Sequence, residues 1–292
     1  MSAVEEHLAT RNAAGLFDFS FMALYEFQGR PQLQRLQTRD LEPLVPGQIA
    51  YTLLLKDDGA VLIDATIWRL DAERFWLFTG KRVPVQALER SGEYAILALQ
   101  GPASGAILAR LIGREAVLSL RYFHFIEKDS LVIGRLGFSG ELGYELLVPA
   151  REAPRLSQEL LDLKVPECGW KAADSLRIES GYVLFDREID GRANPRELGL
   201  ARLVGDAARR FRFTRKLAGF EIVDGAPGAD LPVARVTSEC LSPTLGKRIA
   251  LGFAPPEAPP GTTVRLADGR AARVAALPFH DPLRRLPRGT PL

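Results

Sequence analysis

The pattern of hydrophobic residues changes near Ala207, and this change constrains the fold more than any other feature of the chain. Before it, candidate strands alternate with stretches of helical periodicity. After it, proline and glycine are frequent, and short runs of strand-forming residues occur at 233–237, 248–253, 263–266 and 272–277. Short strands separated by turns are typical of small β barrels. The sequence therefore predicts an α+β region over residues 1–206 and a C-terminal β-barrel domain over residues 207–292.

Local patterns within the first region predict individual elements. The runs 48–55 and 61–70 flank the turn Lys56-Asp57-Asp58-Gly59, which predicts a β-hairpin. Residues 83–91 leave room for no more than a turn or two of helix. Further strands are expected at 74–79, 94–100, 131–137 and 144–148, and helices at 103–112, 151–163 and 172–181.

Composition excludes several classes of protein. The 292 residues are 47% hydrophobic and 25% charged, as in globular proteins, and the interspersed net charge of +2 predicts no nucleic-acid partner. Cys168 and Cys240 show no spacing typical of a disulfide framework or a metal site, so we expect no metal and a reducing, cytoplasmic location. A charged N-terminus and the lack of a long apolar run argue against export and against a membrane anchor.

Three charged residues stand out because their neighbours are apolar. Asp64 is the one carboxylate in the run 61–67, so it either faces a cleft, has a partner, or lies on the polar side of an alternating strand. Glu145 and Arg177 could together recognise a heterocycle that has both donor and acceptor edges, or could form structural salt bridges or surface charge. The common catalytic motifs of hydrolases, phosphate-binding loops and metalloproteases do not occur.

Seven segments, in order along the chain, resemble conserved boxes of the glycine-cleavage T-protein (aminomethyltransferase) family. Gly137-Phe-Ser-Gly-Glu-Leu-Gly-Tyr-Glu145 resembles its GYTGE-x-G-aromatic-E box, and 236–247 resembles its VTSG-x-x-SPTLGK box. The others are 15–22, 51–55 with 59–64, 98–102, 174–179 and 194–199. Each box alone is weak, but seven in family order identify the chain as a member.

The resemblance implies a cloverleaf of two intertwined α+β lobes and a barrel, with tetrahydrofolate held in a central channel. It implies that Asp64 is the catalytic aspartate and that Tyr51, Glu145 and Arg177 are folate-site residues, with Glu145 on the pterin edge. In the family reaction, an aminomethyl group on a lipoylated carrier loses ammonia and its methylene passes to the folate. The carboxylate of the family aspartate orients the folate electrostatically.

Several positions depart from the family pattern. The chain starts close to the first box, so we expect an N-terminally shortened, divergent member. Phe21 replaces a His, Ile63 the first of two Asp, Gly80 an Asn and Phe138 a Tyr.

Two classes of function therefore stay open. The first is a tetrahydrofolate-dependent transferase of an aminomethyl or methyl group, whose donor is a lipoylated carrier protein or a small methylated or aminomethyl compound. The second is a folate-binding protein or subunit without transfer, including a YgfZ-like role in iron–sulfur maintenance. The region 213–220 lacks the K-G-C-Y-x-G-Q-E box of YgfZ-like proteins, which disfavours that last role.

Overall fold

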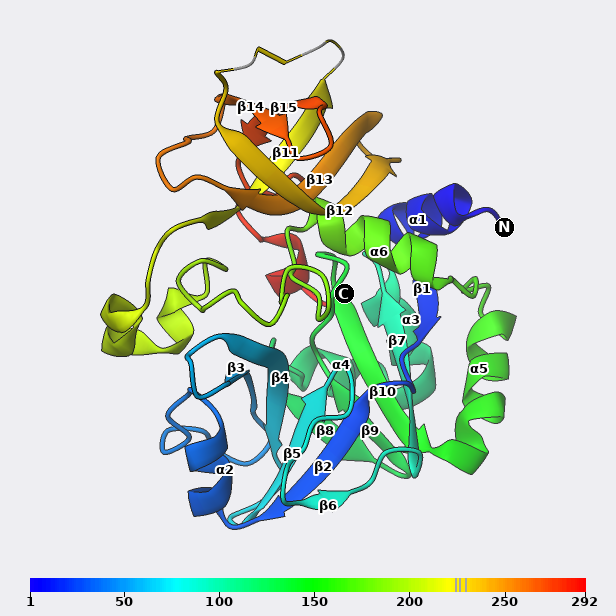
Figure 1. Ribbon diagram of the computed structural model, residues 1–292. Coiled ribbons are helices and arrows are strands. Elements are labelled where there is room, and N and C mark those ends of the chain that lie inside the picture. The colour runs from blue at the N-terminus through cyan, green and yellow to red at the C-terminus, as the bar shows by residue number, and fades with distance from the viewer. Residues whose placement is uncertain (224, 226, 229) are drawn as a thin grey trace. The chain divides into compact units, whose positions relative to one another are not determined.

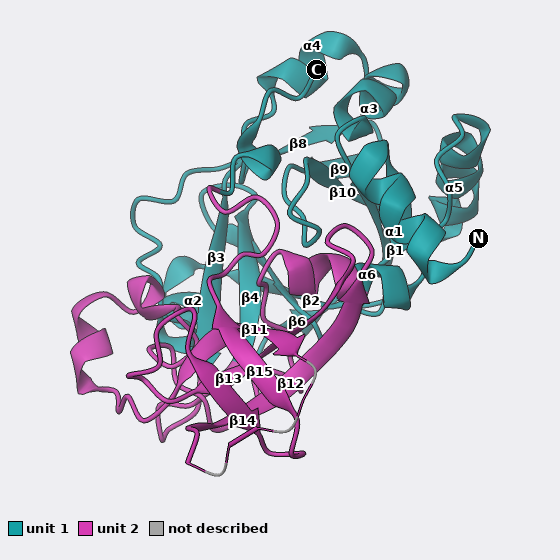
Figure 2. Cartoon of the chain, turned by 90° about the horizontal axis from the view of Figure 1, so that it is seen from above, with its two compact units in different colours: residues 1–54, 63–173, 284–292 teal, residues 55–62, 174–283 magenta. Residues whose placement is uncertain are grey.

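The computed structural model describes residues 1–223, 225, 227–228 and 230–292 (Figure 1). The chain forms two compact units, coloured separately in Figure 2. Unit 1 comprises residues 1–54, 63–173 and 284–292, and unit 2 comprises 55–62 and 174–283. Helices and sheets are both present and a closed barrel lies near the C-terminus, as the predicted α+β class requires. The domain limits expected at residues 206 and 207 stay a prediction.

Unit 1 contains a five-stranded antiparallel sheet in the order β1-β7-β10-β9-β8. Its strands are β1 (Gly15–Asp18), β7 (Tyr94–Gln100), β8 (Phe125–Lys128), β9 (Leu131–Gly134) and β10 (Gly143–Pro149). Side chains alternate between the two faces of a strand, so Tyr144, Leu146 and Val148 of β10 enter one hydrophobic core. Leu108 and Leu156, from two helices, complete that core. The same alternation turns Glu145 to the opposite face.

A second five-stranded sheet of unit 1 has the order β3-β4-β5-β2-β6. Its strands are β2 (Ala23–Gln28), β3 (Ile49–Leu55), β4 (Val61–Arg69), β5 (Arg74–Thr79) and β6 (Leu88–Glu89). The predicted hairpin of residues 48–70 is confirmed as β3 and β4. Residues 83–91 form no helix, because part of that segment pairs with β2 as the short strand β6.

Six α-helices accompany the sheets in the described residues. They are α1 (Ala3–Asn12), α2 (Arg30–Leu36), α3 (Ser104–Ile112), α4 (Arg114–Ser119), α5 (Ala153–Asp162) and α6 (Trp170–Glu179). Short 3₁₀ helices are η1 (Ala150–Glu152), η2 (Ala201–Leu203), η3 (Gly205–Arg210) and η4 (Leu286–Arg288). Ser2 begins α1 with a capping box, since its hydroxyl accepts from the Glu5 amide at 3.3 Å and its own amide donates to the Glu5 carboxylate at 2.6 Å.

Unit 2 contains the closed barrel, in the order β11-β13-β12-β14-β15. Its strands are β11 (Lys216–Val223), β12 (Val233–Ser242), β13 (Lys247–Ala254), β14 (Thr263–Leu266) and β15 (Ala271–Ala275). The predicted barrel is confirmed, although β12 is longer than expected and β11 was not predicted as a strand. Phe220, Val264 and Val274 are among the buried side chains that fill the barrel.

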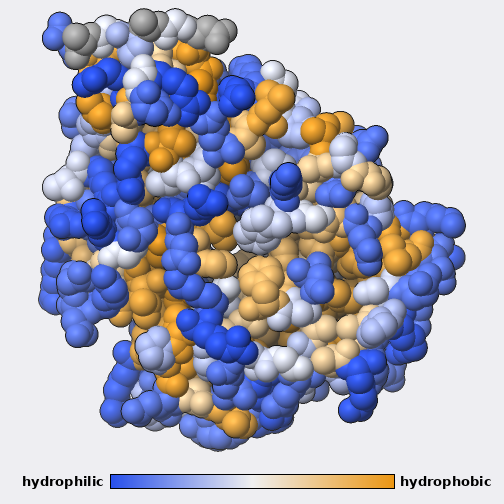
Figure 3. Space-filling model, turned by 45° about the vertical axis from the view of Figure 1, so that its right-hand side comes forward, coloured by the Kyte–Doolittle hydropathy of each residue, from blue (hydrophilic) through white to orange (hydrophobic). Residues whose placement is uncertain are grey.

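The surface carries both hydrophobic and hydrophilic residues. Figure 3 shows one face of the molecule, on which hydrophobic residues lie among hydrophilic ones. Scattered exposed hydrophobic residues are normal for globular proteins. No helix in the described part of the chain is long and apolar enough to cross a membrane.

Candidate functional site

Tyr51 and Asp64 meet on one face of the second sheet of unit 1. They come from the neighbouring strands β3 and β4, and the Tyr51 hydroxyl donates a hydrogen bond to Oδ2 of Asp64 at 2.9 Å. Burial raises the pKa of Asp64 above its ordinary value, and the Tyr51 hydrogen bond opposes only part of that rise. Ionisation of Asp64 is therefore unfavourable, and one hydrogen bond from the Tyr51 phenol stabilises the ionised carboxylate.

The alternation of β4 explains which residues accompany Asp64. Ile63 is fully buried and lies on the opposite face, so the isoleucine that replaces a family aspartate belongs to the core. Asp64 lies on the more polar side of an alternating strand, as one of the sequence-based readings supposed, but it also has a partner. Two of the three alternatives left open for Asp64, a partner and the polar side of the strand, therefore apply together.

Gly80 directly follows β5, the strand that pairs with β4. Strand β5 pairs with β4 so that Thr79 is opposite Ala65, and the antiparallel register carries Gly80 towards the position opposite Asp64. The residue that replaces the family asparagine therefore lies just beyond the paired part of β5, near the level of Asp64 on β4. A glycine there supplies no side-chain amide.

Glu145 presents a buried carboxylate from the first sheet of unit 1. Its exposed fraction is 8%, and burial raises its pKa to about 7. Within the described residues, its carboxylate has no hydrogen-bond or ion-pair partner. A buried carboxylate without a partner is destabilising, so it marks a place where a ligand with N–H donors could be held.

Trp68 connects the two sheets on the side that carries these acidic residues. Its indole N–H donates to the Thr66 hydroxyl at 3.1 Å, which shows that Thr66 and Trp68 share a face of β4, and Asp64 lies two residues further along the same face. A Cβ atom at Gly134 would lie 2.2 Å from Cη2 of Trp68. Gly134 pairs with Glu145, so these two residues share a face of the first sheet. The face that carries Glu145 is therefore opposite the face of the second sheet that carries Asp64 and Trp68, within unit 1.

Five aromatic side chains form a connected cluster in unit 1, which we call the aromatic cluster: Phe17, Phe19, Phe21, Phe138 and Trp170. Phe19 lies at its centre, with ring centroids 4.5 Å from Phe138 and 5.7 Å from Phe21. Two departures from the family pattern, at residues 21 and 138, are thus parts of one apolar contact network. Phe21 is 49% exposed, so its ring forms the outer edge of the aromatic cluster.

Arg177 lies in unit 2, on α6, and its guanidinium is fully engaged there. It donates to Asp174 at 2.8 Å, to Glu188 at 2.7 Å and to the Ser238 hydroxyl at 2.6 Å. The carbonyl of Tyr182 accepts a further bond at 3.2 Å. Glu188 is completely buried, so Arg177 balances its charge inside the protein. The structure therefore brings Tyr51 to Asp64, whereas Arg177 belongs to a separate polar network in unit 2.

Both cysteines have thiols whose pKa values lie above the ordinary value. Burial raises the pKa of Cys168 to about 11 and that of Cys240 to about 12. Both are free, and no group of three or more His, Cys, Asp or Glu among the described residues is placed to hold a metal ion.

Comparison with known proteins identifies the family. Residues 1–207 match the model of the GCVT N-terminal domain, and residues 215–281 match that of the glycine cleavage T-protein C-terminal barrel domain. The aminomethyltransferase of Symbiobacterium thermophilum is 36% identical over 96% of this chain and 89% of its own length. That of Halothermothrix orenii is 32% identical over 95% of this chain and 91% of its own length.

A solved structure agrees with the sequence comparison. The glycine cleavage system aminomethyltransferase T from Bartonella henselae superimposes with a TM-score of 0.81 and 28% identity, covering 95% of this chain and 89% of that one. The sequence motifs, the paired sheets with the C-terminal barrel and the relatives all agree, and the chain belongs to the glycine cleavage T-protein (aminomethyltransferase) family.

Proposed function

We propose that this protein is a tetrahydrofolate-dependent one-carbon transferase of the T-protein type. Asp64 is its catalytic residue, and Tyr51, Glu145 and Arg177 are its folate-site residues. The observation that carries the proposal is the unpartnered, buried carboxylate of Glu145, in the same unit as the Tyr51–Asp64 pair.

Glu145 fits the chemistry of a pterin. The pterin ring presents N–H donors along one edge, and a carboxylate accepts such donors strongly when both are shielded from water. Binding would supply the partners that the carboxylate lacks and would offset the cost of its burial. No other residue of the predicted site combines a negative charge with an exposed fraction as low as 8%.

Asp64 fits the task of orienting an amine and stabilising positive charge. The Tyr51 hydroxyl fixes one carboxylate oxygen at 2.9 Å, which leaves Oδ1 for a second interaction. A carboxylate held in place before the reaction stabilises developing positive charge without the cost of reorienting solvent. When bound, tetrahydrofolate supplies the nitrogen atoms that accept the one-carbon unit.

Arg177 has a different part in this proposal. Its donors are engaged by Asp174, Glu188, Ser238 and Tyr182, so in this proposal it supports the folate site indirectly and does not donate to the folate. The proposed donor is the lipoylated carrier protein of the glycine cleavage system or a small methylated or aminomethyl compound. The two free cysteines support a location in the reducing cytoplasm.

The aromatic cluster favours a second candidate function, folate binding without group transfer. Phe21 and Phe138 stand where family members have a histidine and a tyrosine, and both rings pack in the aromatic cluster instead of offering polar groups. A binding protein or subunit, including a YgfZ-like one, needs the folate pocket but not those groups.

One pair of measurements separates the two candidates. Calorimetry of the full chain with tetrahydrofolate measures binding, and release of ammonia from an aminomethyl-loaded lipoyl carrier in the presence of folate measures transfer. Binding with ammonia release supports the transferase. Binding alone, with this carrier and with small methylated amines, supports the second candidate. Absence of binding at millimolar folate contradicts both.

A further inference from the structure

A pocket of about 680 Å³ lies entirely within unit 2, and none of the residues assigned to folate lines it. Its walls come from the β3–β4 turn, from the loop that contains Asp190 and Arg192, and from the segment that ends η3. The volume is in the range of small-molecule sites, but the lining is mostly charged, which is unusual for a site that binds an apolar ligand.

Direct contacts tie the three walls together. Nζ of Lys56 donates to the Gly191 carbonyl at 2.7 Å, and the side-chain amide of Asn194 donates to the Arg212 carbonyl at 3.0 Å. The ring of Phe211 packs so closely on Gly59 that a Cβ there would lie 2.7 Å from Cε1. Gly59 also has a φ of 81°, a conformation that favours glycine. Contacts between the three segments therefore hold the walls of the pocket in place.

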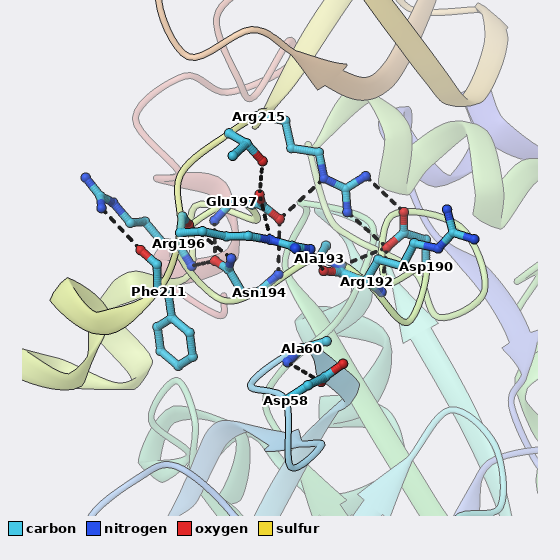
Figure 4. A network of polar contacts seen from close by, with 12 residues as sticks. Asp58, Ala60, Asp190, Arg192, Ala193, Asn194, Arg196, Glu197, Phe211 and Arg215 are labelled. Carbon is cyan, nitrogen blue, oxygen red and sulfur yellow. Dashed lines mark hydrogen bonds and ion pairs between the residues drawn. The ribbon is translucent and has the colours of Figure 1, made fainter.

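The carboxylate of Asp190 is already neutralised by partners. Figure 4 shows Arg215 reaching both of its oxygens, at 3.1 and 3.2 Å, and Arg235 donates to it at 2.5 Å. Burial alone would raise the pKa of Asp190, but the Arg215 side chain and the amides of Arg192 and Ala193 outweigh it and lower that pKa to about 2. Asp190 therefore adds no uncompensated negative charge to the pocket.

Positive charge in the pocket is only partly balanced. Lys56 lies 3.7 Å from Asp58, and Arg212 lies 3.7 Å from the buried Glu197. Arg192 and Arg210 also line the pocket, and within the described part of the chain neither guanidinium has a hydrogen-bond or ion-pair partner. Two free guanidinium groups in one concave site attract anions and can each bind a phosphate or carboxylate with two parallel hydrogen bonds.

We propose that this pocket binds a small multivalent oxyanion, a molecule with two or more phosphate or carboxylate groups. Arg192 and Arg210 supply the main contacts, and Lys56 adds a third positive charge at the rim. The site goes beyond the proposed folate function, because its lining includes none of Tyr51, Asp64, Glu145 and Arg177.

Calorimetry of the full chain at about 150 mM salt, with inorganic pyrophosphate in one arm and citrate in the other, tests the proposal. Either anion binding in the micromolar to low millimolar range supports it, and the arm that binds more tightly identifies phosphate or carboxylate as the recognised group. Arg192→Glu and Arg210→Glu should each weaken binding about tenfold or more, because each loses charge-assisted hydrogen bonds.

Arg114→Glu is the matched control, since Arg114 is an exposed arginine of unit 1 and no hydrogen bond or ion pair of its side chain is found among the described residues. It changes the net charge by the same amount and should leave binding unchanged. Circular dichroism of each variant verifies folding. The proposal is overturned if neither anion binds, or if Arg114→Glu weakens binding as much as the two pocket variants do.

Discussion

The phenol of Tyr51 donates to Oδ2 of Asp64 at 2.9 Å, across two neighbouring strands. This bond opposes the effect of burial, which raises the pKa of Asp64. Burial and the Tyr51 hydrogen bond therefore shift the pKa of Asp64 in opposite directions. The charge state of Asp64 depends in part on Tyr51, a residue 13 positions away in sequence.

Tyr51→Phe should shift the pH dependence of transfer. Removing the hydroxyl removes the one side-chain bond that lowers the pKa of Asp64, so that pKa rises further. If the ionised carboxylate is the active form, the acid limb of the pH–rate profile moves to higher pH. Rates of ammonia release measured from pH 5 to pH 9 test this, and an unshifted acid limb would argue against a catalytic role for the pair.

Asp64→Asn should lower kcat about 100-fold and change folate affinity much less. The substitution keeps the shape of the side chain but removes the charge that acts on developing positive charge. Steady-state kinetics and folate calorimetry on the same preparation measure both quantities. Equal losses in kcat and in folate affinity would assign Asp64 to ground-state binding.

Glu145→Gln should stabilise the folded protein while weakening folate binding. The pKa of Glu145 is about 7, raised by burial from an ordinary value of 4.5. The penalty is absent below pH 4.5, grows as the pH rises towards 7 and is constant above it. The rise in pKa from 4.5 to about 7 corresponds to about 3 kcal/mol of stabilisation for the variant at pH 8.

Urea unfolding at pH 5 and pH 8 measures that gain, which should be much larger at pH 8. Folate affinity of the unmodified protein should rise with pH up to about 7, because the pterin donors need the ionised carboxylate, and should then level off. The variant should lose this pH dependence. An unchanged folate affinity in Glu145→Gln would remove Glu145 from the site.

Arg177→Ala should destabilise the protein by about 3–5 kcal/mol, because it leaves the fully buried Glu188 without its cationic partner. Thermal unfolding followed by circular dichroism measures the loss. Arg187→Ala is the control, since Arg187 directly precedes Glu188 and is exposed, and it should change stability by no more than about 0.5 kcal/mol. Similar effects of the two substitutions would contradict a structural role for Arg177.

The sequence alone determined most of the local structure and the family. Hydrophobic alternation and a four-residue turn predicted the β3–β4 hairpin, because both signals act over a few neighbouring residues. The capping box of α1 is a local signal of the same kind, because it depends only on Ser2 and Glu5, three positions apart. Strand β6 was not readable, since two residues become a strand only when β2 supplies the hydrogen bonds.

Only the tertiary structure decided how distant side chains combine. The alternation of hydrophobic residues could place Asp64 on one face of its strand and Glu145 on one face of its own. It could not show that the Tyr51 hydroxyl donates to Asp64, or that the carboxylate of Glu145 lacks a partner. It could not show that Arg177 is engaged by Ser238, which lies 61 residues away. Such pairings depend on which strands and loops become neighbours after folding, and that is set by burial of the whole core rather than by any local run of residues.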